Sequence, residues 1–411
     1  MRVLIVSQYY PPEPFEQIAD FVARLRAAGH EVTVLTSFPC YPKGKIFDGF
    51  KQTLGYRRDE NGTMVHRVVQ YPDHSRSALR RIFFYVSFLC TAIIRAALSR
   101  PKCDVVLAYQ TSITVGLAGR VIAWLLRKKV VFFVLDLWPE SVTATEMIRN
   151  RVLLRLLKAA CSWIYRSADV NACITEGYIA RLEDMGVARN RLRLVRYWAP
   201  DAAGGGCAEV GRWNAANPFR IVYAGNIGPA QGLDAILDAA ETLQGAGERV
   251  EFILAGDGLD LSRLSERAEK CCLQNVKFLG RRPLTEMPAL HSGADALLVH
   301  LKPDVLSRVS IPSKTVSYLC FGKPLVMAVE GECTRLVERT GCGVVATPSS
   351  GPSLVGAVRR LLAAPDDERA AMGRRARALW EEEFNPNVLA PRLMALLESC
   401  SHCTPQKSKG V

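Results

Sequence analysis

The sequence predicts an α/β protein built from two doubly wound, parallel-sheet domains. Short apolar runs alternate with segments of helical periodicity along almost the whole chain, which is typical of strand, helix, strand units. The alternation forms two series, separated by a glycine-rich stretch without periodicity, and 411 residues exceed what one hydrophobic core usually serves. We therefore expect domains at 1–200 and 219–385, a linker at 201–218, a last helix at 386–400 and a disordered tail at 401–411.

The first series opens with the continuous apolar run Val3–Val6, which is typical of a buried parallel strand. A polar turn and a helix follow, in which Ile18, Phe21, Val22 and Leu25 recur at helical spacing before Gly29. Further strands are expected at 31–36, 65–69, 104–109, 129–135, 169–174 and 192–195. Further helices are expected at 80–98, 115–126, 153–166 and 176–185.

The second series begins after the linker and has the same alternation. Strands are expected at 221–224, 250–258, 276–280, 294–300 and 324–328. Helices are expected at 233–243, 261–270, 287–291 and 313–321, with two more beginning at 354 and 366. Because open α/β sheets bind ligands outside the carboxyl ends of their strands, we expect a binding cleft between the facing strand ends of the two domains.

The chain carries a concentrated positive charge. Hydrophobic residues at 49% and charged residues at 23% describe a globular protein with a net charge of +13. The window 76–135 holds ten Lys or Arg against one acid, Asp104, which is a surplus of nine. Interleaved aromatic residues favour an anionic membrane surface, to which each basic side chain contributes roughly 1 kcal/mol. Nucleic acid is the competing partner, but no nucleic-acid-binding motif accompanies the charge, so we expect none.

Thirteen cysteines scattered through apolar segments indicate free thiols in a reducing cytoplasm. The pair Cys400 and Cys403 lacks a second ligand pair, so no metal is expected there. The apolar run 82–94 is 13 residues long, shorter than the roughly 20 that span a bilayer, so it is expected to lie in the interface without crossing. A buried core helix is the alternative.

A glycine-rich turn at 223–233 joins an expected strand to an expected helix. Gly225, Gly228 and Gly232 would allow backbone N–H groups to approach a phosphate. The turn matches neither the nucleoside-triphosphate loop nor the dinucleotide fingerprint, so an ordinary turn is the alternative. Gly256 to Gly258, Gly280 to Arg282 and Ile311 to Lys314 also lie at expected strand or helix ends. Ser313 could simply cap its helix and Lys314 could be solvated, but four such loops together favour an anionic ligand.

The matching edge of the first domain is acidic and aromatic. Tyr9, Tyr10 and Glu13 follow its first strand, and the sequence Asp-Leu-Trp-Pro-Glu at 136–140 follows the strand at 129–135. Carboxylates accept hydrogen bonds from hydroxyl groups and aromatic rings stack on C–H faces, so these residues suit a polyhydroxylated ligand. Asp136 or Glu140 could instead cap the helix that follows.

Five stretches in sequence order carry a resemblance. They are Ser-Gln-Tyr-Tyr-Pro-Pro-Glu-Pro-Phe at 7–15, Phe-Pro-x-Tyr-Pro-x-Gly-Lys-Ile at 38–46, Asp-Leu-Trp-Pro-Glu-Ser at 136–141, Ala-Gly-Asn-Ile-Gly-x-Ala-Gln-Gly-Leu at 224–233 and Ile-Pro-Ser-Lys at 311–314. Together they resemble bacterial family 4 glycosyltransferases, closest to the subgroup of N-acetyl-L-fucosamine and colanic-acid transferases. The resemblance covers about 1–397.

The resemblance implies a GT-B fold, with two Rossmann-like domains and a last helix that crosses back to the first. It implies a retaining glycosyltransferase without cofactor or obligate metal, in agreement with the absence of Asp-x-Asp from the sequence. The donor would be a UDP- or GDP-sugar. The expected catalytic residues are Asp136, Glu140 and Lys314. The expected donor-binding residues are Gly225, Asn226, Gly228, Gln231, Gly232, Gly256, Asp257, Arg281, Pro312 and Ser313. The expected acceptor-binding residues are Tyr10, Glu13, Phe15 and Trp138.

The acceptor would be a lipid-linked saccharide on polyprenyl diphosphate, used in surface polysaccharide synthesis. The segment between Arg80 and Arg100 would then hold a cytoplasmic enzyme peripherally at the inner face of the membrane. Two alternative functions remain: a sugar-nucleotide epimerase with the same architecture, and a non-catalytic partner that binds nucleotide sugars.

The chain departs from the family pattern at several positions. Asn226 and Gln231 stand where many members have Arg and Lys, and Glu16 stands where the subgroup has Arg. Val309 and Ser317 align with an acidic pair of the family, which leaves the ribose contacts unassigned. Glu330 or Glu332 could substitute for that pair.

Overall fold

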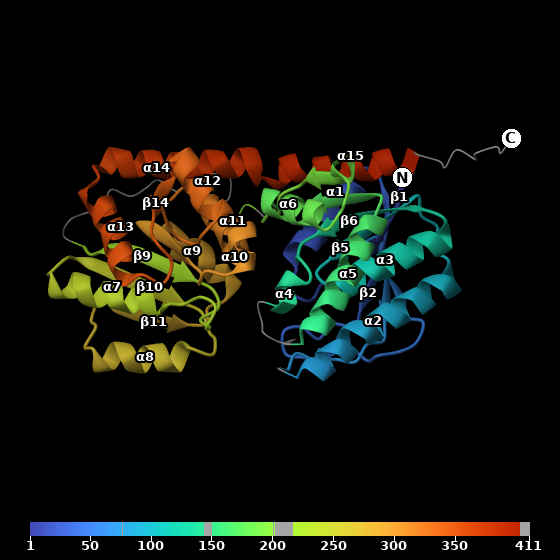
Figure 1. The fold of residues 1–411 in the computed structure, drawn as a ribbon, viewed down its shortest axis with the longest axis horizontal. Coiled ribbons are helices and arrows are strands. Elements are labelled where there is room, and N and C mark those ends of the chain that lie inside the picture. Colours follow the sequence, from blue (N-terminus) through green and yellow to red (C-terminus); the bar gives the residue numbers. More distant parts are fainter. Residues whose placement is uncertain (76, 144–149, 200, 202–216, 403–411) are drawn as a thin grey trace. The chain divides into compact units, whose positions relative to one another are not determined.

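The computed structural model describes residues 1–75, 77–143, 150–199, 201 and 217–402, and it divides the chain into two compact units (Figure 1). Unit 1 comprises Met1–Arg196 and Leu389–Val411, and unit 2 comprises Tyr197–Val388. Each unit contains one sheet whose strands alternate in sequence with helices. The prediction of two α/β domains with parallel sheets is confirmed.

Unit 1 contains an eight-stranded sheet in the order β3-β4-β2-β1-β5-β6-β7-β8. All neighbouring strands are parallel except β3 and β4. The side chains of β1 and β5 are almost all buried, as expected for central strands covered on both faces. The strands are β1 Arg2–Val6, β2 Glu31–Ser37, β3 Arg57–Glu60, β4 Thr63–Val68, β5 Val105–Gln110, β6 Lys129–Val134, β7 Val170–Cys173 and β8 Leu192–Leu194.

The helices of unit 1 are α1 Glu16–Ala27, α2 Ala78–Ser99, α3 Ile113–Leu126, α4 Glu140–Thr143, α5 Arg151–Ser167 and α6 Glu176–Asp184, with a short 3-10 turn η1 at Arg189–Arg191. The last helix, α15 Pro386–His402, belongs to unit 1 from Leu389 onward. Ser401 and His402 are therefore helical, where the sequence predicted a disordered tail. The rest of that tail, and most of the predicted linker, lie outside the described residues.

Unit 2 contains a six-stranded parallel sheet in the order β11-β10-β9-β12-β13-β14. Strand order reverses beside β9, so the chain that leaves β9 starts at the point where α/β sheets bind ligands. The strands are β9 Phe219–Ala224, β10 Val250–Ala255, β11 Val276–Gly280, β12 Ala296–His300, β13 Leu325–Ala328 and β14 Gly343–Val345. The helices are α7 Asp234–Gly245, α8 Leu261–Lys270, η2 Leu284–Glu286, α9 Met287–Ser292, α10 Val305–Val309, α11 Ser313–Leu319, α12 Glu332–Thr340, α13 Gly351–Ala363 and α14 Asp366–Glu383.

The elements that the sequence did not predict are short or polar. Strand β3 reads Arg-Arg-Asp-Glu and lies exposed at the sheet edge, so it has no apolar run to reveal it. Helix α10 has five residues and is fixed by a capping box between Asp304 and Ser307. Helix α12 and the three-residue strand β14 were also missed.

Helix α2 is longer and more apolar than the run 82–94 suggested. Its segment Leu79–Ser99, 21 residues, is long and apolar enough to cross a membrane by length and composition, so the expectation that it is too short to cross is wrong. Phe84, Phe88 and Ala92 are nevertheless buried inside unit 1. One side of the helix therefore packs on the domain.

Candidate functional site

The loops that follow β9 and β10 touch through glycines. A Cβ on Gly256 would lie 1.8 Å from the carbonyl oxygen of Gly225, and a Cβ on Gly258 would lie 2.3 Å from that of Ile227. The N–H of Gly225 donates to the Ala255 carbonyl at 2.9 Å and the N–H of Ile227 donates to the Asp257 carbonyl at 2.8 Å. Only glycine permits this approach. The glycines at the ends of β9 and β10 therefore bring the two loops into contact, and together the loops form a surface that we call the rim.

The side chains of Asn226 and Gln231 form hydrogen bonds within the glycine-rich loop. The Asn226 amide nitrogen donates to Oε1 of Gln231 at 2.8 Å, and the N–H of Gly228 donates to the same oxygen at 3.2 Å. The N–H of Gln231 donates to the Gly228 carbonyl. The sequence predicts that these groups bind phosphate, and the structure adds that they hold the shape of the loop.

Lys314 lies against this loop. Its Nζ donates to the Tyr223 hydroxyl at 2.6 Å and stands 3.9 Å from the centre of the Tyr223 ring. A Cβ on Gly225 would lie 2.9 Å from the same Nζ, so a side chain at this position would crowd the ammonium group. Desolvation lowers the pKa of Lys314 to about 7. The Tyr223 hydroxyl in turn donates to the Asn226 carbonyl at 2.6 Å, which links Lys314 to the loop.

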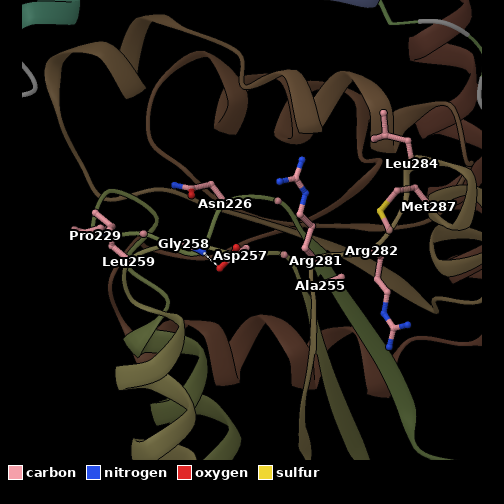
Figure 2. A pocket seen from close by; sticks show the side chains of 13 residues that line it. Asn226, Pro229, Ala255, Asp257, Gly258, Leu259, Arg281, Arg282, Leu284 and Met287 are labelled. Atoms are coloured by element: carbon pink, nitrogen blue, oxygen red, sulfur yellow. Dashed lines mark hydrogen bonds between the residues drawn. The ribbon is translucent and has the colours of Figure 1, made fainter. Parts of the chain in front are cut away.

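A pocket of about 690 Å³ opens beside the rim and is drawn in Figure 2. Its wall includes the predicted residues Gly225, Asn226, Gly228, Gly256, Asp257 and Arg281. Figure 2 shows the side chains of Arg281 and Arg282 extending in opposite directions. Asp257 accepts the N–H of Gly258 through Oδ1 at 2.7 Å. The structure thus brings three of the four predicted loops together around one cavity, with Lys314 of the fourth loop against Gly225.

His300, at the end of β12, joins the glycine-rich loop to the segment before α13. Its Nδ1 lies 2.5 Å from the Gln231 carbonyl oxygen, and its Nε2 accepts the N–H of Ser349 at 3.1 Å. This pattern requires a neutral ring with the proton on Nδ1, and burial lowers the pKa accordingly. Gly232, beside Gln231, has φ +61, and a Cβ there would lie 2.7 Å from Cγ of Lys302. Gly232 therefore belongs to this junction.

Helix α11 begins without a side-chain cap. Pro312 occupies the N-cap position, and Ser313 is exposed in the first turn, so the alternative that Ser313 caps the helix is wrong. Of the acidic substitutes considered for the ribose, Glu330 pairs with Arg308 at 2.6 Å and Glu332 is buried at the start of α12. Neither carboxylate lines the pocket described above.

Unit 1 presents an aromatic cluster above the carboxyl ends of its central strands. The rings of Tyr9 and Phe15 stack with centroids 4.5 Å apart, and Tyr41 lies 5.5 Å from Tyr9. Phe84 and Tyr85 of α2 extend the cluster. Phe15, predicted as an acceptor residue, is therefore part of a stacked aromatic surface.

Asp136 follows β6 and is half-buried near Tyr41 and Tyr178. Desolvation raises the pKa of its carboxyl to about 6. Within the described part of the chain, we find no hydrogen-bond donor or cation paired with this carboxylate. A carboxylate with a raised pKa beside aromatic rings can accept a proton from an alcohol near neutral pH.

Trp138 and Glu140 lie just beyond Asp136. The ring of Trp138 meets Tyr85 edge-on at 5.7 Å, and its backbone N–H donates to the Tyr165 hydroxyl at 3.1 Å. Glu140 begins helix α4 and lies near Cys161 of α5, where burial and, to a smaller extent, the Glu140 charge raise the pKa of the thiol. Trp138 therefore joins the aromatic surface, whereas Glu140 lies near α5.

Glu13 and Tyr10 face inward. The Glu13 carboxylate accepts the backbone N–H groups of Tyr10, Cys40 and Tyr41 at 3.2, 2.9 and 2.8 Å, and only 3% of the residue is exposed. The Tyr10 hydroxyl is buried beside Thr63. Both were expected to contact an acceptor, but the structure uses them to fix the loop that carries Tyr9 and Tyr41.

Sequence reasoning missed Tyr223, Tyr318 and His300. The Tyr318 hydroxyl donates to the Ala224 carbonyl at 3.0 Å and accepts the Ala224 N–H at 2.7 Å. All three lie in apolar stretches that the sequence predicts as strand or helix. The available signal was a polar atom at a buried position next to a strand end, which must find a partner there.

The two α/β domains with parallel sheets match the fold of GT-B glycosyltransferases. The Glycosyl transferase 4-like domain family matches residues 16–198, and the Glycosyl transferases group 1 family matches residues 212–379. The chain belongs to the family 4 glycosyltransferases and resembles the colanic-acid enzymes, as predicted.

Relatives support this placement. The chain is 25% identical over 399 residues to WcaI of Escherichia coli, named as a colanic acid biosynthesis glycosyl transferase, with 93% of this chain and 97% of WcaI covered. It is 25% identical over 264 residues to WbjE of Pseudomonas aeruginosa, named as a glycosyltransferase, with 61% and 64% covered. The fold matches Anabaena HepE in complex with UDP, with a TM-score of 0.67, 16% identity and coverage of 97% and 100%.

Proposed function

We propose that this protein is a retaining glycosyltransferase that moves a sugar from a UDP- or GDP-sugar to a lipid-linked saccharide during surface polysaccharide synthesis. The observation that carries the proposal is the position of Lys314, a desolvated amine held by Tyr223 against the glycine-rich rim of a large pocket. A nucleotide in that pocket would place its diphosphate beside the amine.

Lys314 would meet the charge that develops on the departing nucleoside diphosphate. An ammonium group fixed in a poorly solvated site stabilises such charge more strongly than one in water. We propose that transfer proceeds without a metal, with Lys314 supplying the positive charge. Removal of divalent ions with a chelator should then leave turnover unchanged.

Asp136 would act at the acceptor. Its carboxyl, with the pKa raised to about 6, is ionised at neutral pH and could orient the acceptor hydroxyl and take its proton. Trp138 and Phe15 would contact the acceptor sugar through their rings. Glu140, at the start of α4, would help to orient the acceptor hydroxyl.

The acceptor would be carried on polyprenyl diphosphate, and the segment between Arg80 and Arg100 would hold the enzyme peripherally at the cytoplasmic face of the membrane. Support comes from the relatives: WcaI is named for colanic acid biosynthesis, and the structural neighbour WaaG is described as involved in lipopolysaccharide biosynthesis. HepE has been crystallised with UDP and with UDP-glucose, which supports a nucleotide-sugar donor.

The experiment is a thermal-stability screen of UDP- and GDP-sugars, followed by transfer assays with the nucleotide sugar that stabilises most. A ligand present at 100 times its Kd stabilises by roughly 2.7 kcal/mol, which is readily seen as a rise in Tm. Lys314→Ala should reduce turnover by about a hundredfold or more, in the range of lost electrostatic donors.

The outcomes separate the alternatives. Transfer with wild-type activity in the Lys314→Ala variant would remove Lys314 from the diphosphate site. A product with the mass of the donor sugar nucleotide and no need for an acceptor would identify an epimerase. Binding without transfer to any lipid-linked acceptor would identify a non-catalytic partner. NMR of the product linkage tests retention of the anomeric configuration.

A further inference from the structure

Three neighbouring helices of unit 1, α2, α3 and α5, form one layer with an unusual composition. Helix α3 packs on β5 and β6 and contacts both α2 and α5, and the three lie side by side in Figure 1. Their sequences contain no Asp or Glu. They contain eight basic residues, which are Arg80, Arg81, Arg95, Arg120, Arg151, Arg155, Lys158 and Arg166.

Large apolar side chains are concentrated on the outside of the same layer. Of the seventeen that are exposed in the described part of the chain, twelve lie on these three helices. They are Leu79, Ile82, Phe83, Val86, Ile94 and Leu98 on α2, Trp124 and Leu125 on α3, and Val152, Leu153, Leu156 and Trp163 on α5. Single exposed apolar residues need no explanation, but a gathered set marks an interaction surface.

Helix α5 has three distinct faces at 100° per residue. Cys161, Ile164 and Tyr165 form the buried face. Val152, Leu156 and Trp163 fall within one narrow arc on another face, and they are 63%, 63% and 56% exposed. The basic residues of α5 occupy the arc between these two. A helix that covers a sheet in water normally has a polar outer face, and this one has an apolar stripe with a basic edge.

Helix α2 repeats the arrangement. Phe84, Phe88, Ala92 and Ala96 recur every four residues and are buried, whereas Ile82, Phe83, Val86 and Ile94 lie on the opposite side and are exposed. Trp124, 68% exposed, ends α3 between them. Tryptophan rings with one apolar and one polar edge favour the boundary between lipid headgroups and acyl chains.

From these observations we infer that α5 and the end of α3 join α2 in one membrane-docking surface, in which the α5 stripe inserts shallowly into an anionic phospholipid layer while the basic edge binds lipid phosphates. The inference rests on the proposed peripheral function and extends it from the segment 80–100 to a second helix. A second copy of this chain is a poor occupant, because two such faces would oppose basic residues without any acid to pair them. An anionic bilayer satisfies both the apolar stripe and the charge.

The test uses the full chain and vesicles that contain no acceptor. Wild-type protein is floated with phosphatidylcholine vesicles, with and without phosphatidylglycerol, at low and high salt. The double variant Val152→Glu/Leu156→Glu is compared with Leu54→Glu/Val305→Glu, which places the same substitutions at exposed apolar positions outside the three helices. Circular dichroism and stabilisation by nucleotide check that each variant is folded.

We expect the wild type and the control variant to float with anionic vesicles and to release as salt rises. The α5 variant should bind at least about tenfold more weakly, because two apolar side chains no longer enter the lipid. Absence of wild-type binding at low salt would overturn the inference, as would equal binding by the α5 variant. A wild-type dimer that the α5 substitutions convert to monomer, without vesicle binding, would assign the surface to self-association and also overturn it. Because flotation needs neither donor nor acceptor, its result is independent of whether the proposed transfer reaction is found.

Discussion

At the scale of single residues, the surroundings of the Lys314 ammonium suit the binding of an anion. Its ammonium is desolvated, and its recorded partners are one phenol hydroxyl and one aromatic ring. Within the described residues no carboxylate pairs with it. A desolvated cation without a counter-ion loses stability relative to its neutral form, and a bound anion restores the charged form. A diphosphate bound beside Lys314 would therefore favour the charged form of its amine.

This environment predicts a pH dependence of donor binding. The pKa of Lys314 is lowered to about 7, so in the free protein the positive charge is present below that pH and is lost as the pH rises through it. Donor affinity should therefore fall between about pH 7 and pH 9, and binding in that range should take up a proton because the bound diphosphate raises the pKa. Calorimetry of nucleotide binding in buffers of different ionisation enthalpy measures that proton.

The matched variant is Lys314→Arg. A guanidinium group stays charged throughout this range, so the variant should bind donor with little pH dependence, although its different geometry weakens binding overall. Equal donor affinity at about pH 6 and pH 9 in the wild type, with no proton uptake, would contradict a charge role for Lys314.

Sequence alone singles out residues whose type is unusual for their position, and the structure places Lys314 against the predicted glycine-rich loop. Lys314 and the glycines were visible because charge and glycine at element ends have few structural uses. Glu13 is also a charged residue just after a predicted strand, but its carboxylate already accepts hydrogen bonds from three backbone N–H groups. Those donors come partly from Cys40 and Tyr41, far along the chain, so no local pattern could show that the carboxylate was already satisfied.

At the scale of elements, the glycine-rich loop is held at its far end by His300. The ring bridges Gln231 on the loop and Ser349 on the segment before α13, so it fastens two separate connections to the end of β12. The expected strands and helices of unit 2 could be located from periodicity. This bridge could not, because it depends on which loops the parallel sheet brings to the same edge.

His300→Leu should therefore destabilise the protein and weaken donor binding. The substitution removes both part-buried hydrogen bonds that the ring makes, to the Gln231 carbonyl and from the Ser349 N–H, which costs roughly 2 kcal/mol in the free energy of unfolding. His300→Gln, which can restore one of the two hydrogen bonds, should recover part of the loss. Urea unfolding and nucleotide titration measure the two effects.

His291 provides the control for this substitution. It is also buried in unit 2, between the rings of Tyr318 and Phe321, but in the part of the chain that the structure describes neither of its ring nitrogens has a hydrogen-bond partner. His291→Leu should be neutral or stabilising, because it removes buried polar atoms that lack partners. A loss in His291→Leu as large as that in His300→Leu would show that ring volume, and not the bridge, sets the effect.

At the scale of the whole molecule, the residues assigned to donor and acceptor belong to different units. The pocket, Lys314 and His300 are all formed within Tyr197–Val388, whereas Asp136 and the aromatic cluster are formed within Met1–Arg196. Each unit has its own sheet and its own core. Nucleotide binding should accordingly be a property of unit 2, measurable in the full chain without any acceptor.

Hydrogen exchange with and without the stabilising nucleotide tests this division. Amides in the four rim loops of unit 2, at 224–233, 255–260, 280–287 and 311–315, should exchange more slowly when nucleotide is bound, because a ligand that binds only the folded state suppresses local opening. The loops of unit 1 at 7–15, 38–46 and 136–141 should not change. The Lys314→Ala variant should lose protection on the rim at the same nucleotide concentration while the core of unit 2 exchanges as before. Protection that appears first on the unit 1 loops would place the nucleotide in the wrong unit and refute the assignment of the donor site.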